Sequence, residues 1–296
     1  MRQDQGAAMA ISEVSSASTT WVPRAGHRIH AELTPGTGDP IVLLHGFPDN
    51  LHLYDDLMPH LGQRPVVRFD FLGWGRSDKP AGYPYTADNQ TGDLAAVLDH
   101  LDLRDVVLVA HDASGPPAID WALLHPYRIK ALVLLNTYYH LTLGLRRPPA
   151  IALFSTPVLR VAARRVVSRW RAADRRLYRW QVGRFITDRQ RRDEVVPALY
   201  EQFAAAQPAF WRLNTDLFGT LLARRRRLAD LRRFDRPVRI VFGARDRYLS
   251  PRVARRLANL FPAANLELIE DASHYVQIDA PTRTALAILT AGQPVT

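Results

Sequence analysis

Two candidate nucleophiles, Asp112 and Ser114, lie in the stretch Ala-His-Asp-Ala-Ser-Gly that follows the apolar run 106–109. A strand that runs directly into a helix can hold one residue at the tip of a strained turn, and the residues two before and two after it must then be small. With Asp112 at the tip, these residues are Ala110 and Ser114. With Ser114 at the tip, they are Asp112 and Pro116, which fit poorly. The spacing therefore indicates Asp112 as the nucleophile, with a helix cap as the alternative role.

A nucleophile of this kind needs a base, and the base needs an acid that orients it. His274 lies just after the last predicted strand, and Asp246 lies just after the strand before it. We therefore expect Asp112, His274 and Asp246 to form a catalytic triad.

The elements that must position these residues are six short apolar runs with the length and aliphatic content of strands. The runs cover residues 40–44, 66–71, 106–109, 131–135, 238–242 and 266–269. Segments with helical periodicity separate them, at residues 51–61, 86–101, 116–125, 251–260 and 282–291. Because strand and helix alternate, we expect an α/β fold whose mostly parallel central sheet carries helices on both faces.

The alternation is interrupted once, over residues 138–235, where helical periodicity continues without a convincing strand. We expect this segment to be a helical cap inserted at the carboxyl edge of the sheet, where open α/β sheets bind ligands. Residues 21–137 and 236–296 are then predicted to form the core domain. Residues 1–20, rich in Ser, Ala and Thr, are predicted to be a disordered leader and lack the pattern of a secretory signal.

The composition excludes several kinds of chemistry. The chain has no cysteine, which rules out disulfides, thiolate catalysis and Cys-ligated zinc and fits a reducing cytoplasm. No run of eighteen apolar residues occurs, so we expect no stable membrane insertion.

Positive charge is concentrated in one part of the chain. Residues 141–234 contain 21 Arg and 7 acidic residues, a net charge of +14 within a total of +10. The first interpretation is a solvated helical face, and the alternative is a surface that attracts an acidic substrate or carrier protein. No nucleic-acid-binding motif accompanies the arginines, so we expect no nucleic-acid partner. The oligomeric state cannot be predicted from this pattern.

Four short motifs follow one another in a recognisable order. They are His45-Gly46-Phe47-Pro48, the stretch from Asp70 to Pro80 (DFLGWGRSDKP), His111-Asp112, and Ser273-His274-Tyr275-Val276-Gln277. With these motifs, over roughly residues 25–293, the chain resembles the α/β-hydrolases of the epoxide hydrolase and haloalkane dehalogenase branch. The resemblance implies an α/β-hydrolase fold, a small-molecule substrate, and catalysis without a metal or other cofactor.

The resemblance also implies a two-step mechanism. The carboxylate of Asp112 attacks an sp³ carbon and forms an ester, and His274 then activates a water molecule that attacks the ester carbonyl. Asp246 keeps His274 in the correct tautomer. The backbone N–H groups of Phe47 and Ala113 are expected to form the oxyanion hole.

Two leaving groups are compatible with this mechanism. Dehalogenases of this branch hold the halide with a Trp after the nucleophile, helped by a second Trp or by an Asn, which in one subgroup follows His-Gly. This chain has Ala113 and Phe47 at the first and last of these positions. Epoxide hydrolases protonate the epoxide oxygen, usually with two cap tyrosines. Candidates here are Tyr138, Tyr139, Tyr178 and Tyr200. We therefore expect epoxide hydrolysis to a diol, with dehalogenation at an atypical halide site as one alternative and a specialised pathway enzyme or ligand-binding relative as another.

Further residues are candidates for the substrate pocket. Trp211 in the cap and Tyr275 beside the histidine could contact the substrate, although packing between helices is the alternative role for each cap aromatic residue. Ala113, in place of a bulky Trp, is expected to leave room for a fairly bulky substrate.

Overall fold

The computed structural model describes residues 17–215 and 217–293. Its centre is an eight-stranded sheet in the order β1-β2-β4-β3-β5-β6-β7-β8. The strands are β1 (Ser18–Arg24), β2 (His27–Thr34), β3 (Ile41–Leu44), β4 (Val66–Phe69), β5 (Val106–Asp112), β6 (Ile129–Thr137), β7 (Val238–Gly243) and β8 (Ala264–Ile269). From β4 to β8 all neighbouring strands are parallel, whereas β1 and β2 are antiparallel to their neighbours. The predicted α/β fold with a mostly parallel sheet is confirmed.

The antiparallel edge of the sheet corrects the predicted N-terminal segment. Residues 18–20 lie in β1, so the leader predicted for residues 1–20 is wrong at its carboxyl end, and residues 1–16 lie outside the described residues. Neither β1 nor β2 is among the six predicted strands. β1 lies at the edge of the sheet, and only its Val22 is buried. The strand therefore lacks the continuous apolar run on which the prediction depended.

The helix predicted for residues 51–61 is also corrected. The chain forms two short 3-10 helices instead, η1 (Leu51–Tyr54) and η2 (Met58–His60). The Asn50 side chain caps η1 by accepting a hydrogen bond from the His52 N–H, and Pro59 lies in the first turn of η2. Proline lacks the N–H that a continuous helix would need at this point.

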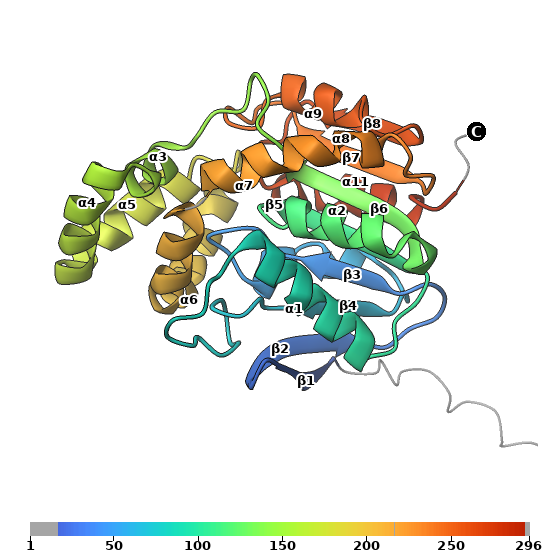
Figure 1. Ribbon diagram of the computed structural model, residues 1–296, viewed down its shortest axis with the longest axis horizontal. Coiled ribbons are helices and arrows are strands. Elements are labelled where there is room, and N and C mark those ends of the chain that lie inside the picture. The colour runs from blue at the N-terminus through green and yellow to red at the C-terminus, as the bar shows by residue number, and fades with distance from the viewer. Residues whose placement is uncertain (1–16, 216, 294–296) are drawn as a thin grey trace, which may run out of the picture.

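Helices surround the sheet. They are α1 (Ala87–His100), α2 (Gly115–Leu124), α9 (Pro251–Ala258), α10 (Val276–Asp279) and α11 (Pro281–Leu289), with a 3-10 turn, η3 (Pro126–Arg128), before β6. Helices α1 and α2 contact each other on the side of the sheet nearer to the viewer in Figure 1, while α9 packs on β7 and β8. Every residue of β3 is buried, as are the first six of β5, which explains the apolar sequences of β3 and of residues 106–110 in β5.

Between β6 and β7, in the segment predicted to be a cap, the residues that the structure describes form further helices. They are α3 (Pro149–Ser155), α4 (Pro157–Arg169), α5 (Arg171–Val182), α6 (Arg189–Thr215), α7 (Leu217–Ala223) and α8 (Leu228–Leu231), with a 3-10 turn, η4 (Arg224–Arg227), before α8. Helices α3, α4, α5 and α6 lie at the left of Figure 1, beyond one end of the sheet, and the chain returns through α7 and α8 toward β7. The division of the chain into core and cap at residues 138 and 235 remains a prediction.

Candidate active site

The turn after β5 holds Asp112 in the left-handed region of backbone conformation, with φ of 49°. Helix α2 begins only three residues later, at Gly115. The Ser114 hydroxyl accepts a hydrogen bond from the His111 N–H at 2.9 Å and is 2.9 Å from the Leu44 carbonyl, to which it donates. The buried Ser114 hydroxyl is therefore hydrogen-bonded to the backbone around the turn, whereas Asp112 lies at the tip of the turn.

Small residues let other parts of the chain approach this turn. A Cβ atom on Gly46 would lie 2.7 Å from the Cβ of Asp112, and one on Gly115 would lie 1.9 Å from the Thr137 hydroxyl oxygen. Both glycines are thus required by close packing around the turn. The approach of the loop after β3 brings the Phe47 N–H to 3.3 Å from Asp112 Oδ2.

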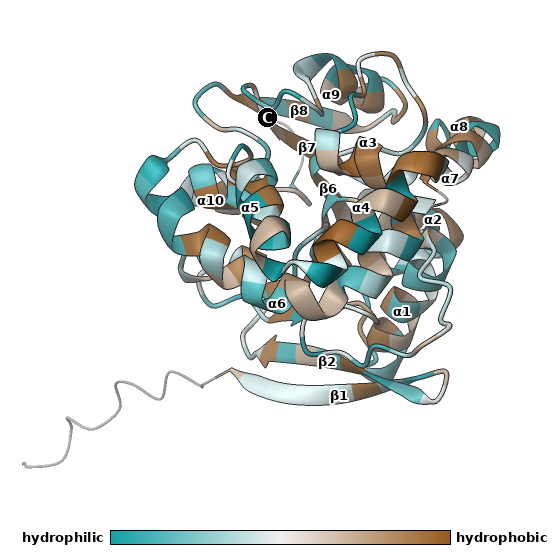
Figure 2. Ribbon diagram, turned by 90° about the vertical axis from the view of Figure 1, so that its left-hand side faces the viewer, coloured by the Kyte–Doolittle hydropathy of each residue, from teal (hydrophilic) through white to brown (hydrophobic). Residues whose placement is uncertain are grey.

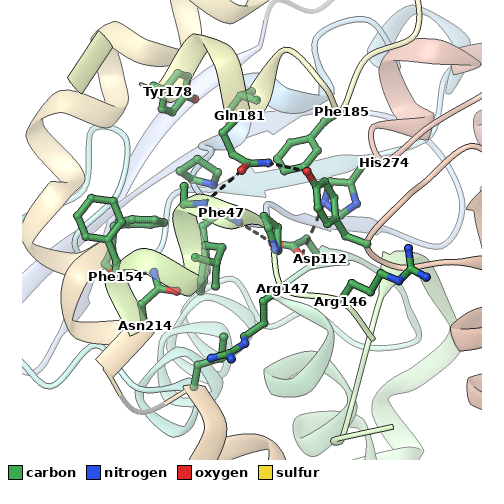
Figure 3. A pocket seen from close by; sticks show the side chains of 18 of the residues that line it. Phe47, Asp112, Arg146, Arg147, Phe154, Tyr178, Gln181, Phe185, Asn214 and His274 are labelled. Carbon is green, nitrogen blue, oxygen red and sulfur yellow. Dashed lines mark hydrogen bonds and ion pairs between the residues drawn. The ribbon is translucent and has the colours of Figure 1, made fainter. Parts of the chain in front are cut away.

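The three predicted triad residues meet at the carboxyl ends of β5, β7 and β8. Nε2 of His274 lies 3.7 Å from Oδ1 of Asp112, and its Nδ1 lies 2.7 Å from Oδ2 of Asp246. Figure 3 shows His274 and Asp112 directed toward each other at the wall of the pocket. The His111 ring packs on His274, with 4.9 Å between ring centroids, and its Nε2 is 3.1 Å from the His274 carbonyl oxygen. The imidazole is held from two sides.

The charges of the three groups shift one another's pKa values. Burial raises the pKa of Asp112, while the His274 charge and the N–H groups of Phe47 and Ala113 partly oppose this. Burial alone would lower the pKa of His274, but the carboxylates of Asp246 and Asp112 raise it above its ordinary value. Such an arrangement can stabilise an imidazolium, and the two N–H groups can stabilise negative charge on an oxygen bonded to the Asp112 carboxyl carbon.

Asn136 holds the acid of this group and was not predicted to do so. Its Nδ2 donates to Asp246 Oδ2 at 2.8 Å, and its Oδ1 accepts from the Gly243 N–H at 2.9 Å. Oδ1 of Asp246 accepts from the N–H groups of Tyr248 and Leu249. Burial would raise the pKa of Asp246, but its interactions with His274 and these N–H groups lower it. The available signal was a polar residue at the end of a buried apolar strand.

A second buried carboxyl group, Asp49, was also missed. It accepts a hydrogen bond from the Tyr275 hydroxyl at 2.7 Å, and its other oxygen is buried without a partner among the described residues. Burial raises the pKa of Asp49 to about 7, and the charge of Asp112 contributes in the same direction. The available signal was its position directly after the His45–Pro48 motif.

The pocket in front of Asp112 and His274 is mostly apolar, and many of its lining side chains are aromatic. Its cavity has a volume of about 100 Å³ and is lined by cap and core residues, among them Phe47, Phe154, Phe185, Phe203, Phe210 and Trp211. Figure 3 shows Phe154 and Asn214 on the side of the pocket away from His274. Ala113 is buried and does not line this pocket, so the space expected beside the nucleophile is not open to it.

Two of the candidate tyrosines line the pocket. Burial raises the pKa of Tyr138 well above its usual range, and the Asp112 charge acts in the same direction. Tyr178 has a buried hydroxyl without a hydrogen-bond partner among the described residues, and burial raises its pKa in the same way. Both phenols are therefore protonated at neutral pH and available as donors.

The other three tyrosines do not line the pocket, because their hydroxyls are bound elsewhere. Tyr275 donates to Asp49, as described above, and Tyr200 donates to Asp174 at 2.9 Å. Tyr139 donates to Asp120 at 2.7 Å.

Asp120 also joins the helical segment between β6 and β7 to α2. Arg224 lies 2.6 Å from its Oδ2, and Arg227 lies 2.9 Å from its Oδ1. Asp120 belongs to α2 and both arginines to η4, so this buried ion cluster connects the end of the cap segment with the helix that follows the nucleophile. Tyr139 is the third donor to the same carboxylate and therefore has a packing role.

Comparison with known proteins identifies the family of the chain. Residues 39–281 match the family described as alpha/beta hydrolase fold. The chain belongs to the α/β-hydrolase fold family. This α/β-hydrolase is 30% identical to haloalkane dehalogenase 2 of Mycobacterium tuberculosis over 281 residues, which cover 91% of this chain and 93% of the relative. The family resemblance stated from the motifs is thus confirmed.

Two further proteins are similar to this α/β-hydrolase. It is 38% identical to a cis-3-alkyl-4-alkyloxetan-2-one decarboxylase of Shewanella oneidensis over 121 residues, which cover 40% of this chain and 38% of that protein. The solved structure of Cfl2 from Burkholderia cenocepacia superimposes with a TM-score of 0.77 at 21% identity, covering 93% and 95% of the two chains. The latter likeness concerns the fold alone.

Two features are absent from residues 17–215 and 217–293. Their His, Asp and Glu side chains form no cluster of three or more that could bind a metal ion. None of their helices combines the length and apolar character needed to cross a bilayer.

Proposed function

We propose that this α/β-hydrolase converts epoxides to diols without a cofactor, using Asp112, His274 and Asp246 as a catalytic triad. The observation that carries the proposal is the content of one pocket: a carboxylate at a strained turn and a buried phenol, Tyr178, whose hydroxyl has no hydrogen-bond partner in residues 17–215 and 217–293. A nucleophile and a free acid facing the same cavity are what epoxide opening requires.

In the first step, an Asp112 carboxylate oxygen attacks an epoxide carbon and the carbon–oxygen bond of the ring breaks. The departing oxygen takes a proton from Tyr178 or Tyr138, which gives a hydroxyalkyl ester of Asp112. Solvent then returns the proton to the phenol. Asp112 needs no base for this step, because it attacks as the carboxylate.

In the second step, Nε2 of His274 removes a proton from water, and the resulting hydroxide attacks the ester carbonyl. The oxyanion forms on the former Asp112 side chain, where the N–H groups of Phe47 and Ala113 stabilise it. The diol leaves, and the imidazolium proton passes to solvent. Asp246, at 2.7 Å from Nδ1, stabilises the imidazolium while it exists.

The aromatic lining supports a fairly bulky apolar substrate. Several phenylalanines and Trp211 surround the cavity, so an aryl or long alkyl group would be buried there. Tyr178 belongs to α5 and Trp211 to α6, and these cap helices would select the substituent of the substrate.

Dehalogenation is a second candidate function. It is favoured by the similarity to haloalkane dehalogenase 2 and by the indole of Trp211 in the pocket, which could bind a halide. A specialised pathway enzyme or a ligand-binding protein remains the third, and it fits the partial similarity to the oxetanone decarboxylase.

The ester intermediate distinguishes these candidates. His274→Gln should still form the ester but should fail to hydrolyse it, so intact-protein mass spectrometry should detect an adduct on Asp112. A set of bulky aryl and alkyl epoxides and the matching bromides would be tested. An epoxide adds its whole mass, whereas a bromide adds its mass minus bromide.

A double variant, Asp112→Asn with His274→Gln, is the matched control and should form no adduct. An adduct on another residue would contradict the proposed nucleophile. A substrate that the unaltered enzyme hydrolyses but that leaves no adduct in His274→Gln would contradict the ester mechanism.

A further inference from the structure

The helices α4 and α5 form a hairpin, residues 157–182, that carries an unusual number of exposed apolar side chains. Val158 is 81% exposed and Trp170 is 59% exposed. Large apolar side chains elsewhere in the hairpin are exposed in the same way: Leu159, Val161, Val166 and Trp180. Exposed apolar side chains that cluster on one element indicate a surface that binds a protein or a membrane.

The hairpin projects away from the sheet. In Figure 1 α4 and α5 lie at the left end of the molecule, beyond α6. In Figure 2, which views this end directly, hydrophobic and hydrophilic positions alternate along α4. The apolar residues are therefore placed where a large, flat partner could reach them.

The same hairpin is strongly basic. It contains eight arginines and one acidic residue, Asp174, a net charge of +7 in 26 residues. Asp174 is buried and bound to Tyr200, so it offers little compensation at the surface. Arg175 pairs with Glu201 at 2.8 Å. The other seven arginines form no ion pair with any residue that the structure describes: Arg160, Arg164, Arg165, Arg169, Arg171, Arg176 and Arg179.

Part of this charge surrounds a shallow hollow on α5. Arg171, Arg175, Arg176 and Arg179 line it, together with Trp180 and Glu201. A hollow with four guanidinium groups and an indole fits a phosphate group that is attached to an amphiphilic molecule, because arginine binds phosphate and tryptophan favours a membrane interface.

We propose that the α4–α5 hairpin binds the surface of a membrane that contains anionic phospholipids. The arginines would contact lipid phosphates, while Val158, Leu159 and Trp170 would enter the boundary between headgroups and acyl chains. A basic helix with exposed aliphatic and tryptophan side chains has the composition of such an interfacial element. The hairpin would lie on the membrane surface without crossing it.

Charge and side-chain type favour this occupant over others. A second copy of the chain would bring another hairpin with a charge of +7 against the first, and like charges repel. Nucleic acid would neutralise the arginines but would leave the exposed valines and leucine without an apolar partner. An anionic bilayer satisfies both kinds of side chain.

The inference goes beyond the proposed function and does not depend on it. The inference also predicts where the pocket lies relative to the membrane, because α3, which lines the pocket, is followed directly by α4. Ala150, Ile151 and Phe154 of α3 line the pocket, so binding through the hairpin would hold the cavity close to the bilayer.

Flotation of the full chain with lipid vesicles tests the proposal. The protein should float with vesicles that contain phosphatidylglycerol and should stay in solution with pure phosphatidylcholine. Arg165→Ser with Arg169→Ser should weaken binding by roughly 30-fold, since two arginines leave the charged surface. Arg252→Ser with Arg255→Ser on α9 removes the same charge elsewhere and should bind like the unaltered protein.

The apolar contribution is tested separately. Val158→Ser with Leu159→Ser should weaken binding by roughly fivefold or more without changing the net charge. Leu124→Ser with Leu286→Ser removes two exposed leucines outside the cap and is the matched control. Circular dichroism would establish that all variants are folded.

Several results would overturn the proposal. Equal binding to neutral and anionic vesicles would do so, as would equal losses in the hairpin and control variants. Binding to an acidic carrier protein without flotation would identify a protein partner instead. If the unaltered protein were a dimer without lipid and the hairpin variants monomers, the occupant would be a second copy.

Discussion

The two walls of the pocket differ in how their polar atoms are bound. On the core wall, Asp246 accepts hydrogen bonds from His274, Asn136 and two backbone N–H groups. On the cap wall, the hydroxyl of Tyr178 and the Oδ1 of Asn214 are buried without a partner among the described residues. The Nδ2 of Asn214 donates to the Phe210 carbonyl in its own helix, which leaves the amide oxygen as the free acceptor.

From this difference we expect the core wall to carry out the catalytic steps and the cap wall to bind the substrate. The hydrogen bonds to Asp246 and His274 on the core wall fix the geometry of the triad before a substrate arrives. An unpaired buried polar group costs about 1–3 kcal/mol, so the cap wall gains when a substrate supplies the missing partner. We therefore expect core substitutions to lower kcat and cap substitutions to act through substrate binding or protonation.

The largest effect is expected at the tip of the turn. Asp112→Ala should reduce kcat/KM by at least ~10³-fold, because it removes the proposed nucleophile. Ser114→Ala should retain most of the activity but should unfold at a lower temperature, since its hydroxyl bonds only to the backbone. Steady-state kinetics and thermal unfolding measure the two effects. Inactivity of a folded Ser114→Ala with an active Asp112→Ala would reverse the assignment.

The free phenol on the cap wall is expected to have the next largest effect. Tyr178→Phe should lower kcat for epoxides by ~10²-fold, because general-acid assistance is lost. Tyr200→Phe is the matched control, since its hydroxyl bonds to Asp174 and does not line the pocket. Rates with an activated bromide should change little in either variant, because halide departure needs no proton. A normal epoxide rate in Tyr178→Phe would leave Tyr138 as the acid.

The comparison is sharpest between two asparagines. Asn136→Ala should lower kcat by about tenfold with little change in KM, because it removes a charged hydrogen bond that holds Asp246. Asn214→Ala should instead raise KM for substrates with a hydroxyl or N–H group and should leave kcat nearly unchanged. If both variants change the same kinetic parameter, kcat or KM, then the expected division between catalysis on the core wall and substrate binding on the cap wall is wrong.

The smallest expected effect concerns stability and pH at Asp49. Its pKa of about 7 in the folded state lies above the ordinary carboxyl value, so the folded state holds the proton more tightly than the unfolded one. This group therefore destabilises the protein increasingly as pH rises from about 4 to about 7, and fully above that range. Asp49→Asn removes the buried charge and can still accept the hydrogen bond from Tyr275.

Urea unfolding at two pH values measures this effect. At pH 8, Asp49→Asn should be more stable than the unaltered protein by on the order of 1–2 kcal/mol, and at pH 4 the two should be equal. Asp279→Asn would be a poor control, because Asp279 accepts hydrogen bonds from the N–H groups of Thr187 and Ser273. A pH-independent difference would show that the Asp49 charge has no role.

Much of the fold could be predicted because its signals are local. All six predicted strands occur. For β3 and β5 the signal was a continuous apolar run, which strands buried on both faces need. Strands β1 and β2 were missed because their burial depends on neighbours brought together by the fold. The helix expected at residues 51–61 does not form for a local reason: Pro59 lacks the N–H that a continuous helix needs, and the segment forms two short 3-10 helices instead.

By itself, the sequence determined the α/β alternation and pointed to Asp112 at the tip of the turn, because both depend on residues a few positions apart. Only the tertiary structure decided that Asn136 binds Asp246 and that Asp49 is buried beside Tyr275. It also decided that Tyr178 faces the pocket while Tyr200 does not. Each of these contacts depends on side-chain direction and on the packing of segments far apart in the chain, and neither residue type nor spacing specifies that packing.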